Sequence, residues 1–180
     1  EKLFLGLFTS VTYSRSVADV PYLRDKVDAV MNMSEFLPNT HDRKGLRHIL
    51  EKYPRDELFQ SSIEQLHDTA ISVLNIQERR QTRVYLRRDT YGKFISCLVY
   101  TPRDIYNTEL RQKIESVLES EFSPTDVEFN TYFSESVLAR THFMVRLDPD
   151  KPAKYDADLV ERKIRQVARS WQDDLHDALV

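Results

Sequence analysis

The first half of the chain carries apolar side chains at the spacing of amphipathic α-helices. Between residues 21 and 80 they recur every three or four positions in three stretches, and each stretch predicts a helix with one buried face. Pro21 suits the first turn of the first helix, where a backbone N–H has no helical partner. The apolar positions are Leu23, Val27, Val30 and Met31, then Leu46, Ile49 and Leu50, then Ile63, Leu66, Ala70, Val73 and Leu74.

Capping residues and prolines place the boundaries of these helices. Thr40 or Asp42 offers a side-chain oxygen to the start of the second helix, and Pro54 follows its end. Ser61 and Glu64 have the spacing of a capping box at the start of the third helix. Because each helix is apolar on one side only, the helices must pack on one another or on the domain that follows.

After residue 82 the apolar period shortens to two, which is typical of β-strands. Gly92 lies in the short loop between the first two strands, where a hairpin favours glycine. One helix begins at Asn107 or Thr108, and another begins near Asp156. The predicted strands are 83–88, 94–101, 125–133 and 138–147, and the last two are expected to be half buried.

The order of these elements predicts the fold of the second half. From residue 94 the order is strand, helix, strand, strand, helix, which is the ferredoxin-like pattern without its last strand. In the complete pattern the last strand pairs antiparallel with the first, and the strand at 83–88 suits that place. The predicted sheet order is therefore 83–88, 94–101, 138–147, 125–133, with both helices on one face. The fold class is α+β: a helical segment followed by a ferredoxin-like antiparallel sheet of about four strands.

We expect three segments along the chain. Residues 1–20 are predicted to be a strand and a loop that continue from an upstream element, because Lys2 to Thr9 is a run of β-prone residues. Residues 21–80 form a helical connector, and residues 81–180 form the ferredoxin-like domain. The chain begins at Glu1 without Met or a signal-peptide layout, which predicts a piece of a longer polypeptide.

Composition narrows the class of protein. The 180 residues are 41% hydrophobic and 31% charged, which excludes wholesale disorder, and the apolar runs are far shorter than the roughly 20 residues of a membrane helix. A single cysteine, Cys97, excludes a disulfide scaffold and suits a reducing compartment, so we expect the cytoplasm. The formal net charge of -3 gives no global attraction to nucleic acid or to acidic lipid.

No motif for catalysis, cofactor binding or metal binding stands out. The only glycines are Gly6, Gly45 and Gly92, so neither the dinucleotide-binding turn nor the phosphate loop can be formed from them. Cys97 lies in the middle of a strand, where burial would suppress its reactivity. An acidic group with one histidine follows on the last helix, whose apolar stripe continues to Leu179, and we interpret it as a solvated face. The group is Asp173, Asp174, His176 and Asp177.

A basic and aromatic face is the first candidate site. Arg83, Tyr85 and Arg87 alternate along one strand and therefore share a face. Guanidinium and aromatic groups side by side on a sheet can hold single-stranded RNA or an anionic ligand. The structural alternative is a charged strand edge that resists aggregation or pairs with acidic residues.

The loop at 101–108 is the second candidate site. It leads from a strand into a helix N-terminus, where free backbone N–H groups and the helix dipole favour a carboxylate or a phosphate. Arg103, Asp104, Asn107 and Thr108 supply polar groups there for an effector or another anion. Helix capping and a surface ion pair explain the same residues equally well.

Three longer runs resemble a known family. They are YPRDELFQ at 53–60, LNIQERR at 74–80 and RRDTYGKFISCLVYTPRDIYNT at 87–108. Together they resemble the amino-terminal, non-catalytic region of the large bacterial NAD-specific glutamate dehydrogenases, over essentially the whole chain. In that family the region carries ACT-like domains, which are small ferredoxin-like regulatory or assembly modules. The resemblance therefore agrees with the fold expected from the order of elements.

The resemblance implies a function for a parent enzyme rather than for this chain alone. The parent oxidises L-glutamate with NAD and water to 2-oxoglutarate, ammonia and NADH, and its catalytic residues and NAD site lie outside this sequence. We therefore predict a non-catalytic regulatory or assembly segment, inactive by itself, that contacts the rest of its chain, a homo-oligomer and a small-molecule effector such as an amino acid. The alternative from the residues is a module that binds single-stranded RNA or an anion.

Overall fold

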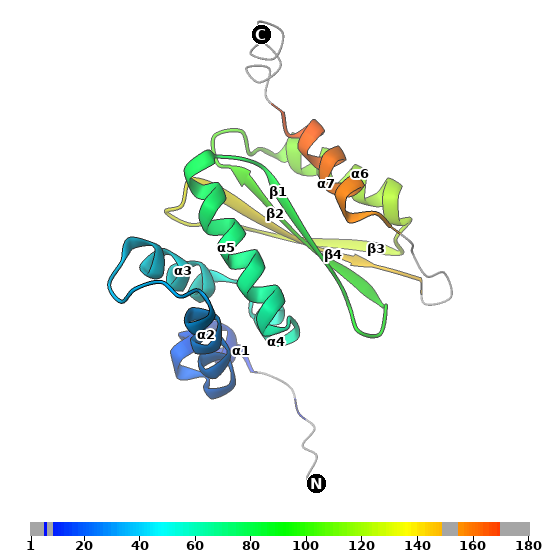
Figure 1. The fold of residues 1–180 in the computed structure, drawn as a ribbon. Coiled ribbons are helices and arrows are strands. Elements are labelled where there is room, and N and C mark those ends of the chain that lie inside the picture. The colour runs from blue at the N-terminus through cyan, green and yellow to red at the C-terminus, as the bar shows by residue number, and fades with distance from the viewer. Residues whose placement is uncertain (1–5, 7–8, 149–154, 170–180) are drawn as a thin grey trace, which may run out of the picture. The chain divides into compact units, whose positions relative to one another are not determined.

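The computed structural model describes residue 6, residues 9–148 and residues 155–169 of the chain (Figure 1). The strand predicted at Lys2 to Thr9 lies outside the described residues except at Gly6 and Thr9. The acidic group at residues 173–177 lies wholly outside them. The chain divides into two compact units, Glu1–Leu74 and Asn75–Val180.

The first unit is helical. Its elements are α1 (Ser10–Ser14), the 3-10 helix η1 (Val17–Asp19), α2 (Pro21–Met33), α3 (His41–Lys52), α4 (Arg55–Gln60) and the first part of α5 (Ile63–Arg79). The three helices predicted from the apolar period are α2, α3 and α5, and most of their apolar positions are buried. The period did not reveal α1, η1 and α4, because a helix of six residues or fewer completes less than two turns.

Side chains cap the N-termini of α3 and α5. Thr40 Oγ1 accepts a hydrogen bond from the backbone N–H of Arg43 at 3.4 Å, which confirms Thr40 as the cap of α3. The capping box predicted for Ser61 and Glu64 is wrong by one residue. The backbone N–H of Gln65 donates to Ser62 Oγ at 3.1 Å, and that of Ser62 donates to Gln65 Oε1 at 3.0 Å. Ser61 still belongs to the end of α4, because its N–H donates to the carbonyl of Glu57.

Close packing within the first unit explains a glycine in the middle of α3. A Cβ atom at Gly45 would lie 2.8 Å from Leu74 Cδ1 of α5. Glycine in a helix interior costs about 1 kcal/mol relative to alanine, and this close approach accounts for its presence. The adjacent α2 carries a buried cation, Lys26, whose Nζ donates to the carbonyls of Leu58 and Phe59 at the end of α4.

The second unit is the predicted ferredoxin-like sheet with two helices. Its elements are the end of α5, β1 (Arg83–Arg88), β2 (Phe94–Pro102), α6 (Thr108–Phe122), β3 (Asp126–Phe133), β4 (Leu138–Arg146) and α7 (Ala157–Val167). The sheet order is β1-β2-β4-β3 and every pair is antiparallel, as predicted. Strand β1 occupies the place of the missing last strand, with Arg83 opposite Tyr100 and Arg88 opposite Ile95. Gly92 takes the positive φ of 69° in the hairpin between β1 and β2.

Helices α6 and α7 cover one face of the sheet, as expected (Figure 1). The core between the sheet and the helices centres on Phe143 of β4, which is fully buried opposite Cys97 of β2. Asn107 begins α6, and Ser123 ends it in the left-handed region at φ 44°. The other buried core residues include Val84, Ile95, Val99, Leu110, Ile114, Leu118, Phe122, Val145, Val160 and Ile164.

The strand at 125–133 is less buried than its alternation predicts: Val127 is only partly buried against the core. No residue of β3 is buried, and the side chains of Phe129 and Phe133 are 47% and 49% exposed. The reason is position: β3 is an edge strand with β4 on one side only, so its apolar side chains reach the core less completely. Strand β4, with a neighbour on each side, alternates buried and partly exposed residues as predicted.

Candidate functional site

The predicted anion loop lies at the junction of β2 and α6, and two of its four predicted polar residues, Arg103 and Asn107, are bound to the fold. Asn107 Oδ1 accepts a hydrogen bond from the backbone N–H of Leu110 at 2.8 Å and so caps α6. The side chains of Asp104 and Thr108 are exposed. Tyr106, in the same loop, is held by a 2.7 Å hydrogen bond between its hydroxyl and Thr131 Oγ1 of β3.

Arg103 is bound to the turn between β3 and β4. Its backbone N–H donates to the carbonyl of Val137 at 2.9 Å, and its Nη1 donates to the carbonyl of Ser134 at 3.1 Å. The guanidinium also lies over the ring of Phe133, with Cζ 5.8 Å from the ring centroid. The geometry therefore brings Arg103 and Asn107 together in one loop but uses both for local structure.

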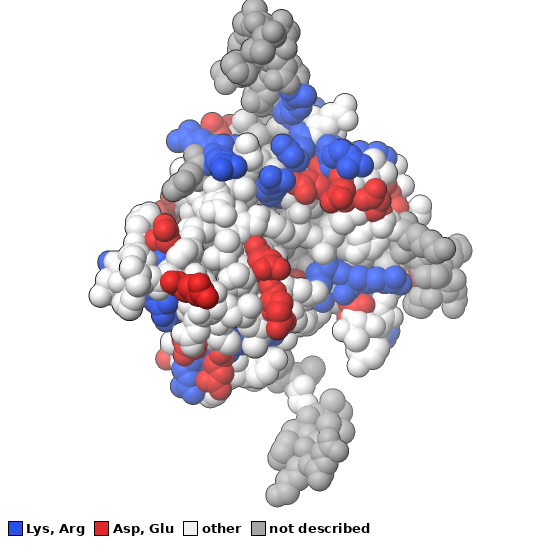
Figure 2. All heavy atoms as spheres, in the orientation of Figure 1, with Lys and Arg blue, Asp and Glu red and all other residues white. Residues whose placement is uncertain are grey.

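The predicted basic face also has structural partners. Arg83 Nη1 lies 2.8 Å from Glu161 Oε1 of α7, and Arg87 lies over the ring of Phe94 at 6.0 Å. Tyr85 makes an edge contact with Tyr100, with ring centroids 5.9 Å apart. On the face shown in Figure 2, basic and acidic groups lie next to each other over α7 and α6 rather than forming one basic field. This arrangement fits the structural alternative, in which the arginines pair with acidic residues.

A serine and a histidine that the sequence did not bring together meet on the face of the sheet away from α6 and α7, which is also the face of Tyr85 and Arg87. Ser96 Oγ of β2 lies 2.8 Å from His142 Nε2 of β4. Such a contact can activate a nucleophile, but Ser96 is only 1% exposed, so a substrate has no access to its hydroxyl. The two residues are 46 positions apart, and only the pairing of β2 with β4 reveals the contact.

Cys97 is buried, as the sequence predicted, and burial raises the pKa of its thiol. The neutral thiol is a poor nucleophile. Within the described residues no group of three or more His, Cys, Asp or Glu side chains is placed to hold a metal ion.

We expect Cys97 to resist thiol reagents in the native chain. Burial excludes the reagent and the raised pKa suppresses the thiolate, so labelling by Ellman's reagent at pH 8 should proceed only through unfolding and slow by at least about a hundredfold relative to the chain in urea. Rapid, complete labelling without denaturant would show that the strand opens and would contradict this core position.

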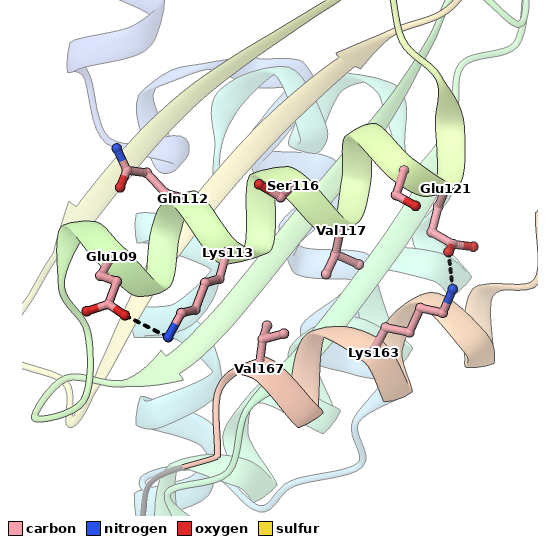
Figure 3. Close-up of a pocket in the computed structure, with 9 residues that line it drawn as sticks. Glu109, Gln112, Lys113, Ser116, Val117, Glu121, Lys163 and Val167 are labelled. Carbon is pink, nitrogen blue, oxygen red and sulfur yellow. Dashed lines mark hydrogen bonds and ion pairs between the residues drawn. The ribbon is translucent and has the colours of Figure 1, made fainter.

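A groove with a volume of about 440 Å³ lies between α6 and α7 (Figure 3). Val117 of α6 and Val167 of α7 face each other across it. Ion pairs lie along it, one within α6 and one between the helices. They are Glu109–Lys113 and Glu121–Lys163. The sequence could not indicate this groove, because its two walls are separated by a hairpin of β-strands.

The described residues do not fit an NAD site. Dinucleotide binding uses a glycine-rich turn between a strand and a helix of a parallel sheet. Here the sheet is antiparallel, Gly45 lies inside α3, and Gly92 lies in a hairpin. The sequence has no glycine between β2 and α6 or between β4 and α7, the two strand-to-helix connections.

Two family models match consecutive parts of the chain. Residues 20–79 match the model described as "Glutamate dehydrogenase, helical motif 1". Residues 83–172 match the model described as "Glutamate dehydrogenase, ACT2 domain", which is half of the chain. The chain belongs to the glutamate dehydrogenase ACT2 family. This confirms the resemblance drawn from the sequence runs, and the four-stranded sheet with two helices agrees with an ACT-like fold.

Relatives that match essentially the whole chain are named as NAD-specific glutamate dehydrogenases. The chain is 49% identical over 180 residues to the NAD-specific glutamate dehydrogenase of Halomonas elongata, covering 100% of this chain and 11% of that protein. It is 48% identical over 177 residues to the enzyme of the same name from Pseudomonas aeruginosa, covering 98% of this chain and 11% of that protein. For the one from Mycobacterium tuberculosis the identity is 33% over 187 residues. The chain therefore spans about a ninth of the length of these relatives. None of its described helices is long and apolar enough to cross a membrane.

Proposed function

We propose that this chain is a non-catalytic assembly segment of an NAD-dependent glutamate dehydrogenase. The parent reaction would convert L-glutamate, NAD and water to 2-oxoglutarate, ammonia and NADH, in the cytoplasm. Support comes from relatives named for this enzyme, each about nine times longer than the chain, and from described residues that do not fit NAD. The chemistry would therefore belong to other parts of the parent polypeptide.

One observation favours assembly over the binding of an effector. The two side chains best suited to hold an anion in the loop after β2 are already bound: Asn107 caps α6, and Arg103 is held by the carbonyl of Ser134. An effector at this loop would have to compete with those hydrogen bonds. Regulation by a small molecule is therefore the second form of the proposal, and the experiment below separates the two.

The proposal predicts that the 180-residue chain alone has no dehydrogenase activity and that the full-length enzyme containing it does. With L-glutamate and NAD, the 180-residue chain should form no NADH, whereas the full-length enzyme that contains it should do so. Isothermal titration of the chain with L-glutamate, 2-oxoglutarate, other amino acids and NAD should show no saturable heat. Saturable binding lost in Arg103→Ala would instead support the regulatory form. Formation of NADH by the chain alone would overturn the proposal.

A further inference from the structure

The groove between α6 and α7 presents apolar side chains at the surface of the second unit (Figure 3). Val117 and Val167 each pack on the core with one side, are only partly buried, and line the groove with the other side. Ser116 and Ser120 lie one turn apart on α6, and their short side chains leave the hollow open. With a volume of about 440 Å³, the groove has room for an aromatic ring and an aliphatic side chain.

Helix α7 ends beside this groove. Its last residue is Val167, and the N–H of Arg169 donates to the carbonyl of Gln166 at 3.4 Å in a tighter closing turn. Trp171 follows Val167 by four positions, a stretch of at most about 14 Å. The indole of Trp171 is therefore within reach of the groove.

The sequence beyond α7 predicts a second, short amphipathic helix. Ser170 and Asp173 have the spacing of a capping box, which places a helix start just after the end of α7. The apolar residues that follow recur at every fourth position and therefore share one helix face. They are Trp171, Leu175 and Leu179. The family model for the ACT2 domain extends to residue 172, so it counts Trp171 within the same domain.

The charges of residues 170–180 are opposite to those at the end of α7. Between residues 162 and 169 the chain carries four basic side chains and no carboxylate. They are Arg162, Lys163, Arg165 and Arg169. Residues 170–180 carry three aspartates and neither lysine nor arginine. The two stretches therefore attract each other, whereas two copies of α7 would repel.

We propose that residues 170–180 fold back as a short helix along the outer side of α6 and α7, with the indole of Trp171 seated between Val117 and Val167. The lengths agree, because a helix of these residues is about 16 Å long and α6 spans about 18 Å from residue 109 to residue 121. The segment covers apolar surface that would otherwise face water, and it anchors the end of α7 to α6.

The same placement accounts for the other side chains of the segment. Leu175 lies one turn beyond the indole, over Ser120. Asp174 flanks the apolar face and reaches Lys163, whose side chain is 44% exposed and has room for a second partner beside Glu121. The remaining acidic side chains face water, in agreement with the solvated face interpreted from the sequence.

Fluorescence of the 180-residue chain tests this placement, because Trp171 is its only tryptophan. Emission should lie at shorter wavelength than in urea, and the acrylamide quenching constant should be at least about threefold smaller, since a packed ring is shielded from water and quencher. Ser116→Tyr fills the groove with another ring and should raise the quenching constant about threefold, to the value in urea. Glu119→Tyr is the matched control: Glu119 is an exposed residue of α6 that does not line the groove, and its replacement should leave the quenching unchanged.

A charge exchange tests the direction of the segment. Asp174→Lys should raise the quenching constant, and its combination with Lys163→Asp should restore the constant to within about twofold, since the two side chains then attract again. Circular dichroism of every variant establishes that the chain is folded.

Four results would overturn the placement. They are an exposed indole in the unmodified chain, equal quenching in Ser116→Tyr and Glu119→Tyr, a double variant no better than Asp174→Lys, and shielding that is lost on dilution from about 50 to about 0.5 µM. The last result would mean that the groove is filled by another copy. None of these results depends on whether the parent is a glutamate dehydrogenase, which the NADH measurement tests.

Discussion

Replacing Val84 by aspartate should remove most of the stability of the second unit. Val84 of β1 is buried in the core beneath α6 and α7, opposite Val99 of β2. The substitution removes an apolar side chain and places a carboxyl group among apolar neighbours, and we expect a loss of about 3–5 kcal/mol in the free energy of unfolding. Chemical denaturation followed by circular dichroism measures this loss.

The loss should depend on pH. A buried carboxyl group has a raised pKa in the folded state, whereas in the unfolded chain it ionises near its ordinary pKa of about 3.9. The unfolded state therefore gives up its proton first as pH rises, and the variant should be least destabilised below about pH 4 and most destabilised near neutrality. Val137→Asp is the matched control, because this valine is 39% exposed and should lose less than about 1 kcal/mol. Equal losses in the two variants would show that β1 is not part of the core.

The effect at Val84 bears on how the sheet is completed. A ferredoxin-like pattern that begins at residue 94 lacks one strand, and β1 supplies it from the preceding part of the chain. This order of strands was predictable, because a hairpin joins β1 to β2 and the remaining crossover leaves one place for each strand. The sequence pattern and the connection rules therefore determined the topology together.

Burial at the sheet edge was not predictable in the same way. The apolar residues of β3 alternate as regularly as those of β4, and alternation reports which side of a strand is apolar, not how many neighbours the strand has. Caps show a similar limit. Ser61 and Ser62 are the same residue type, and only the end of α4 at Gln60 decides that Ser62 caps α5.

The sequence indicated which residues could form the candidate sites, but it did not indicate which groups their side chains bind in the folded chain. The sequence places Arg103 in a loop before a helix, yet its acceptor, the carbonyl of Ser134, lies 31 positions away across a strand pair. Likewise, Arg83 pairs with Glu161 of α7, which lies 78 positions later in the chain. Pairings of this kind arise from topology, which explains why the polar groups that suggested a ligand site are bound to the fold itself.

Replacing Phe143 by alanine should be the other severe change. Phe143 is fully buried at the centre of the core on β4, between Cys97 of β2 and Phe129 of β3. Truncation removes the ring and leaves a cavity that the close-packed helices α6 and α7 cannot fill, so we expect a loss of about 3–5 kcal/mol.

Phe129→Ala provides a matched control at the neighbouring position. The two rings lie 6.2 Å apart in directly opposite positions of β4 and β3, but Phe129 is 47% exposed. Its truncation removes about half as much apolar surface from contact with the protein and leaves a hollow open to water, so the expected loss is about 1–1.5 kcal/mol. Thermal and urea unfolding of both variants compare the sites directly. Similar losses in the two variants would contradict the difference in burial between β4 and β3.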